Sequence, residues 1–134
     1  MNASERPAPP FRVLVAEDFA DFRARLRALL GPLPLELVEA PDGQAAIEIV
    51  RDLASPLHLL ITDLDMPRRT GWEVIDAFRR HRGPGLPVIL QTGEARYADV
   101  RKRAEELGVV LIDKLDVPTR LPAAVCRALG IALR

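Results

Sequence analysis

The sequence predicts an α/β domain in which a doubly wound, five-stranded parallel sheet is covered by helices on both faces. Five apolar runs alternate with amphipathic stretches along the 134 residues, and the links between them are short. Four of the five runs mix β-branched residues with leucines, which is typical of strands buried on both faces. A chain of this length suits one domain.

The five expected strands are the apolar runs themselves. They cover residues 11–16, 35–39, 57–63, 87–92 and 109–113. The second run contains Glu36 and Glu39, so we place it at an edge of the sheet.

The expected helices lie between and after these runs, where apolar residues recur at helical spacing. The apolar stripes are Phe19, Phe22, Leu26, Leu29 and Leu30; Ala46, Ile49, Val50 and Leu53; Val74, Ile75 and Phe78; Tyr97, Val100, Ala104 and Leu107; and Leu121, Val125, Ala128 and Ala132. Gly31, Gly83 and Gly108 stand where three of the helices should end.

Composition excludes several classes of protein. The chain is 49% hydrophobic and carries 19 basic and 19 acidic side chains, which argues against disorder and against direct nucleic-acid binding. No apolar run approaches the length of a membrane span. Residues 1–10, with three prolines and no signal-peptide core, are expected to be a flexible leader before a domain at 11–134. The single cysteine, Cys126, excludes an internal disulfide and suits the cytoplasm.

Polar side chains follow four of the predicted strands. Glu17 and Asp18 come after the first, Asp63 ends the third, Thr92 ends the fourth and Lys114 follows the fifth. Ligands of such folds collect at the carboxyl ends of the strands, so we expect these side chains to meet at one rim.

Three carboxylates in one place favour a bound cation, because otherwise they would repel each other and raise each other's pKa. An all-oxygen site suits Mg²⁺ or Mn²⁺ rather than Zn²⁺, and the two histidines, His58 and His81, are expected far from this rim. A metal beside an aspartate, with a lysine and a threonine in reach, is suited to phosphoryl transfer onto the carboxylate.

The ordered set of motifs resembles the receiver domain of bacterial two-component response regulators. The motifs are Val13-Leu14-Val15-Ala16-Glu17-Asp18, Asp42-Gly43, Leu60-Ile61-Thr62-Asp63-Leu64-Asp65-Met66-Pro67 with Gly71, Thr92-Gly93, and Lys114. The resemblance covers residues 11–132. It implies a flavodoxin-like fold with strand order 2-1-3-4-5.

The resemblance also implies a role for each matched residue. Asp63 would accept a phosphoryl group from a sensor histidine kinase or a phosphotransfer protein. Asp18, Asp63 and the backbone carbonyl of Asp65 would bind Mg²⁺ directly, with Glu17 acting through water. Thr92 and Lys114 would contact the phosphoryl group. The chain would then be a signalling domain with at most slow self-dephosphorylation, not an enzyme.

Partners follow from the same resemblance. Family members contact a downstream protein, or pair as homodimers, through the fourth helix, fifth strand and fifth helix. The fourth helical segment is rich in basic residues (Arg96, Arg101, Lys102 and Arg103), which makes it a candidate partner surface.

Four residues depart from the family pattern or add charge at the rim. Leu115 replaces the proline that usually follows the lysine, so the loop after strand five is expected to differ. Leu111 replaces the aromatic residue whose rotation usually reports phosphorylation. Asp113 could compete for the amine of Lys114, and the side chain of Asp65 could disfavour or redirect an incoming phosphoryl group or water.

Two alternative functions stay open at this point. These departures would also suit a receiver that binds its partner without phosphorylation. The Asp63-Leu64-Asp65 spacing also occurs in haloacid-dehalogenase-type phosphohydrolases, although there the acidic metal pair follows the lysine, whereas Glu17 and Asp18 precede the nucleophile.

Overall fold

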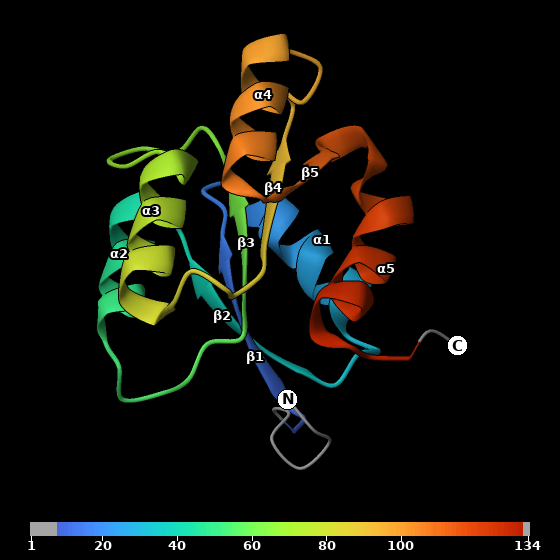
Figure 1. The fold of residues 1–134 in the computed structure, drawn as a ribbon. Helices are drawn as coiled ribbons and strands as arrows, with labels where there is room; N and C mark the ends of the chain where they lie inside the picture. Colours follow the sequence, from blue (N-terminus) through green and yellow to red (C-terminus); the bar gives the residue numbers. More distant parts are fainter. Residues whose placement is uncertain (1–7, 133–134) are drawn as a thin grey trace.

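Five parallel strands form one sheet in the order β2-β1-β3-β4-β5 (Figure 1). The structure is a computed structural model that describes residues 8–132. The elements in chain order are β1 (Phe11–Ala16), α1 (Ala20–Leu30), β2 (Leu35–Ala40), α2 (Gly43–Arg51), β3 (Leu59–Asp63), α3 (Gly71–Arg82), β4 (Val88–Thr92), α4 (Ala98–Leu107), β5 (Val110–Asp113), the 3₁₀ turn η2 (Lys114–Asp116) and α5 (Val117–Leu129). The predicted fold class and strand order are confirmed.

The predicted strands agree with the observed ones to within two residues at either end. The largest difference is at β3, which begins at Leu59 rather than residue 57 because its pairing with β1 begins at Val13↔Leu59. β2 lies at one edge of the sheet, as its glutamates predicted, and β5 lies at the other. Most of the predicted leader, residues 1–7, and the last two residues lie outside the described residues.

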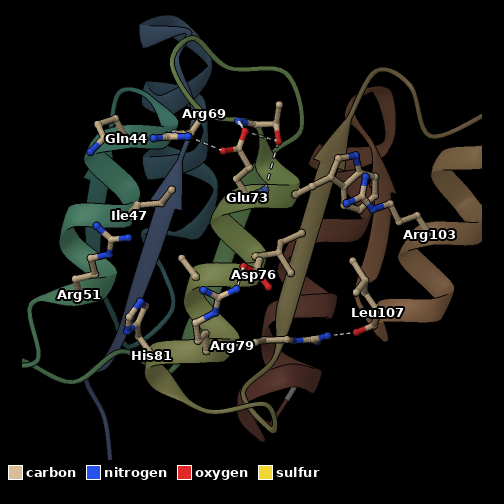
Figure 2. A pocket seen from close by; sticks show the side chains of 15 residues that line it. Gln44, Ile47, Arg51, Arg69, Glu73, Asp76, Arg79, His81, Arg103 and Leu107 are labelled. Carbon is tan, nitrogen blue, oxygen red and sulfur yellow. Dashed lines mark hydrogen bonds and ion pairs between the residues drawn. The ribbon is translucent and has the colours of Figure 1, made fainter.

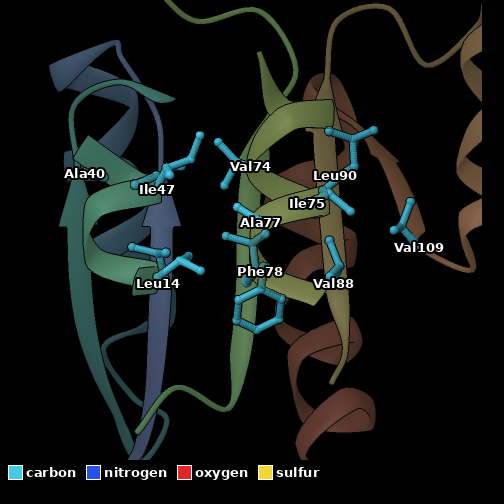
Figure 3. Close-up of a cluster of buried hydrophobic side chains, with 14 of the residues drawn as sticks. Leu14, Ala40, Ile47, Val74, Ile75, Ala77, Phe78, Val88, Leu90 and Val109 are labelled. Atoms are coloured by element: carbon cyan, nitrogen blue, oxygen red, sulfur yellow. The ribbon is translucent and has the colours of Figure 1, made fainter. Parts of the chain in front are cut away.

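Alternate residues of the central strands face two separate cores, which explains why these strands are apolar throughout. Val13, Ile61 and Ile89 pack under α1 and α5. Leu14, Leu60 and Leu90 face the other way, where helices α2, α3 and α4 cover the sheet. Figure 3 shows part of this second cluster, with Phe78 of α3 standing against the strands.

Several helix ends coincide with local sequence signals. Four residues of the predicted apolar stripes nevertheless lie outside the helices, namely Phe19, Leu53, Tyr97 and Ala132. Asp42 caps α2 by accepting a hydrogen bond from the amide of Ala45, and Thr70 forms a capping box with Glu73 at the start of α3. α4 ends at Gly108, whose left-handed backbone (φ 65°) favours glycine. Within residues 8–132 no helix has the length and apolarity that crossing a bilayer requires.

Candidate phosphoacceptor site

The site lies at the carboxyl ends of β1, β3 and β4 and at the residues that follow β1 and β5. Asp63 is the last residue of β3 and is paired in register with Gln91 of β4. Glu17 and Asp18 follow directly after β1, and Lys114 opens the turn after β5. The parallel sheet therefore brings together Glu17 and Lys114, which are 97 residues apart in the chain.

Glu17, Asp18 and Asp63 form one acidic cluster, in which a carboxylate oxygen from each residue lies within 4.8 Å of the others. Glu17 and Asp63 are buried, whereas Asp18 is exposed at the rim. This donor set is made of oxygens only, with one side open to water, and it therefore fits a hard divalent cation such as Mg²⁺ or Mn²⁺.

Lys114 connects the two buried carboxylates. Its Nζ lies 3.1 Å from Oε1 of Glu17 and 2.9 Å from Oδ2 of Asp63. Burial lowers the pKa of Lys114. The hydrogen bonds and charges of Asp63 and Glu17 raise this pKa by more than burial lowers it, so the net effect is a rise. The amine is therefore a fixed positive charge beside Asp63.

Glu17 is the most strongly perturbed carboxyl group among the described residues. Burial, and then the negative charge of Asp63, raise its pKa to about 7, although Lys114 partly offsets both. A cation placed among these carboxylates would favour the charged form of Glu17, because it would relieve the repulsion from Asp63.

Asp63 is held by the backbone around it. Its Oδ1 accepts a hydrogen bond of 2.7 Å from the amide of Leu64. Gly71, the first residue of α3, packs so closely that a Cβ atom there would lie 2.2 Å from the carbonyl oxygen of Asp63. This explains why glycine stands at position 71, since any side chain would push α3 away from the end of β3.

Thr92 lies at the end of β4, beside the strand that carries Asp63. It is buried, and its hydroxyl accepts a hydrogen bond of 3.0 Å from the amide of Glu94. The Thr92 side chain thus shapes the first turn of the loop between β4 and α4.

Asp65 is exposed beyond the rim and lies next to Glu94. The pKa of Glu94 is raised. The largest cause is a hydrogen bond with Asp65, followed by partial burial and then by the charges of Asp65, Asp99 and Asp63. Sequence reasoning identified Asp65 but missed Glu94, which adds a further carboxyl group beside the acidic cluster.

Gln91 is a second residue that sequence reasoning missed. Its amide nitrogen lies 3.5 Å from Oε2 of Glu17, and its own oxygen is buried without a hydrogen-bond partner. The signal was an amide side chain inside the apolar run 87–92, because a buried amide needs polar neighbours.

The four residues that depart from the family pattern or add charge at the rim have distinct structural outcomes. Asp113 does not bind Lys114; its Oδ1 accepts a hydrogen bond of 2.9 Å from the amide of Leu115 and caps the turn η2. Leu115 is 89% exposed at the tip of this turn. Leu111 is half-buried and packs on the cluster beneath α2, α3 and α4. Asp65 lies close enough to Glu94 to raise the pKa of that carboxyl group.

A separate pocket of about 730 Å³ lies over α2, α3 and α4 and includes none of these site residues (Figure 2). Arg103 lies over the ring of Trp72 there, 4.6 Å from the centroid, whereas Arg96 stacks on Tyr97 at the start of α4. Of the basic residues near α4, Arg103 therefore faces α3.

Comparison with known proteins places the chain in a family. The family model described as the response regulator receiver domain matches residues 13–125. The chain belongs to this family. Receiver domains are signalling domains rather than classical enzymes, and membership favours neither the phosphohydrolase nor the phosphorylation-independent alternative.

Individual relatives agree with this assignment. The receiver is 36% identical over 78 residues to Response regulator RR06 of Streptococcus pneumoniae, covering 58% of this chain and 34% of that protein. It is 37% identical over 95 residues to Two-component response regulator ORR41 of Oryza sativa, covering 66% of this chain and 71% of that protein. The receiver thus spans about a third of the length of the first relative.

A solved structure supports the fold. The signal receiver domain of an HD domain-containing protein from Pseudomonas fluorescens superposes with a TM-score of 0.77 at 24% identity, covering 94% of this chain and 96% of that one. The flavodoxin-like arrangement expected from the sequence is thereby confirmed.

Proposed function

We propose that this receiver accepts a phosphoryl group on Asp63 from a histidine kinase or a phosphotransfer protein, in a reaction that depends on Mg²⁺ or Mn²⁺. The observation that supports this most directly is the juxtaposition at Asp63, where two further carboxylates lie within 4.8 Å and an amine lies 2.9 Å away. A divalent cation on one side and Lys114 on the other would flank an incoming phosphoryl group with positive charge.

The chemistry assigned to the residues is an in-line transfer. A carboxylate oxygen of Asp63 attacks phosphorus, the bond from phosphorus to the donor's imidazole nitrogen breaks, and that nitrogen keeps the electron pair. Asp18, Asp63 and the carbonyl of Asp65 would hold the cation, with Glu17 acting through water. The cation would neutralise charge on the phosphoryl oxygens.

Lys114 and Thr92 complete the proposed site from the other strands. The amine of Lys114 would bind one phosphoryl oxygen, and the hydroxyl of Thr92 would donate a hydrogen bond to another. The Thr92 hydroxyl also accepts a hydrogen bond from the amide of Glu94, so a turn of this side chain toward the phosphoryl group would couple the site to the loop before α4. Self-dephosphorylation by water would be slow.

Exposed apolar side chains support a partner surface formed by α4, β5 and α5. Tyr97 is 46% exposed before α4, and Val110 is 45% exposed on the edge strand β5. We propose that this surface contacts the downstream protein or a second copy of the chain, and that the protein acts in the cytoplasm.

Intact-mass measurement tests the proposal. Incubation with acetyl phosphate and Mg²⁺ should add the mass of one phosphoryl group to the wild type and none to Asp63→Asn, and the variant should stay folded. A wild-type chain that takes up no phosphoryl group would support the phosphorylation-independent alternative. Phosphorylation of Asp63→Asn would move the acceptor to another residue.

A further inference from the structure

The amine of Lys114 has a third neighbour besides Glu17 and Asp63, namely the aromatic ring of Phe22 in α1. The Nζ atom lies 4.7 Å from the ring centroid. An ammonium group has three N–H donors, and the two carboxylates each accept from it at 2.9 to 3.1 Å. The ring therefore covers a side of the ammonium that the carboxylates leave free.

An aromatic ring suits this position chemically. Its negative face attracts a cation through the ring quadrupole, yet the ring carries no net charge. A carboxylate here would add further negative charge beside Asp63, and an aliphatic side chain would cover the amine without attracting it. Phe22 can hold the amine in place without competing strongly for its hydrogen bonds.

The space around Phe22 determines how freely the Lys114 side chain can move. Phe22 and Lys114 both line an open, mainly apolar groove of about 590 Å³ between α1 and the start of α5. The other residues of the groove are Arg25, Ala28, Leu29, Leu115 and Pro118. The Lys114 side chain is 27% exposed, so its long, flexible stem has room to turn away from Asp63 if the ring is lost.

We propose that Phe22 is a positioning residue for Lys114. Its ring keeps the amine directed at Asp63, which raises the rate at which Asp63 accepts a phosphoryl group. This inference rests on the proposed phosphorylation of Asp63, and it assigns to α1 a part in the reaction that the motif residues do not include.

The first test compares phosphorylation rates with acetyl phosphate and Mg²⁺. Phe22→Leu keeps an apolar side chain but removes the ring, and should react about fivefold more slowly, which corresponds to about 1 kcal/mol. Phe22→Tyr keeps the ring and should restore a rate close to that of the wild type. Phe19→Leu is the matched control, because Phe19 lies just before the same helix and is 63% exposed; its rate should be unchanged.

The second test observes the contact without any phosphorylation. Because the Nζ atom lies over the ring of Phe22, the protons on the adjacent carbon should show an upfield ring-current shift by NMR in the wild type and in Phe22→Tyr. The shift should disappear in Phe22→Leu. Thermal unfolding of each variant identifies any general loss of structure.

The outcomes separate the two proposals. A folded Phe22→Leu protein that reacts at the wild-type rate, or that keeps the wild-type shift of Lys114, overturns the positioning role alone. A folded Phe22→Tyr protein that reacts as slowly as Phe22→Leu would also overturn the positioning role. Absence of phosphorylation in the wild type itself would refute the proposed function.

Discussion

Lys114 and Asp63 are 51 residues apart in the chain, yet their amine and carboxylate lie 2.9 Å from each other at the ends of two strands that are not neighbours in the sheet. The same amine reaches Glu17, so one positive charge serves two buried carboxylates. This shared ion pair accounts for much of the electrostatics of the site, and the first two predictions follow from it.

Replacing Lys114 with Ala should have opposite effects on metal binding and on phosphorylation. Loss of the amine removes a positive charge that repels a cation, so Mg²⁺ should bind more tightly in a fluorescence or calorimetric titration. Phosphorylation by acetyl phosphate should slow. The metal-free protein should lose about 1–3 kcal/mol of unfolding free energy, because two carboxylates lose their partner. Lys102→Ala, an exposed change on α4, is the control. Weaker Mg²⁺ binding in Lys114→Ala would contradict this account.

The stability of the metal-free protein should decrease as pH rises from about 5 to 8. Glu17 has a pKa of about 7 in the folded state and about 4.5 when unfolded, so the folded state binds more protons over this range. The free energy of unfolding should fall by up to roughly 3 kcal/mol, and urea titrations at a series of pH values will measure it. Mg²⁺ should restore stability at pH 8. Glu17→Gln should flatten the profile; an equally steep profile in that variant would assign the effect to another group.

Asp18→Ala should weaken Mg²⁺ binding at least roughly tenfold, because the loss of even an indirect metal contact commonly costs that much. The thermal stability of the metal-free protein should change little, since the Asp18 side chain is exposed. Asp21→Ala is a suitable control because Asp21 is also exposed and lies in the first turn of α1. An unchanged titration for Asp18→Ala would refute its role as a ligand.

Gly71→Ala should destabilise the protein by about 1–3 kcal/mol, the usual cost of forcing extra atoms into a packed site. The new Cβ would lie 2.2 Å from the carbonyl oxygen of Asp63, so α3 or the end of β3 must shift. Phosphorylation should slow as well, because the acceptor moves with its backbone. At Gly85 a Cβ would have no neighbour within 4 Å, and Gly85→Ala should leave both stability and rate unchanged.

Periodicity and motif order determined the fold class, the five strands to within two residues at either end, and the residues that gather at the rim. This was possible because a strand buried on both faces must be apolar throughout, and parallel strands bring their carboxyl ends to one edge. Glu17, Asp18, Asp63 and Lys114 could therefore be brought together from separate parts of the chain.

Only the tertiary structure decided which partners these groups choose. Asp113 is adjacent to Lys114 in the chain but caps a turn instead, whereas Glu17 binds Lys114 from 97 residues away. The contacts of Gln91, Glu94 and Phe22 likewise depend on how strands and helices pack, because side-chain direction and burial depend on neighbours distant in sequence. The raised pKa of Glu17 has the same origin, since desolvation and charge arise from the packed environment and not from the order of residues along the chain.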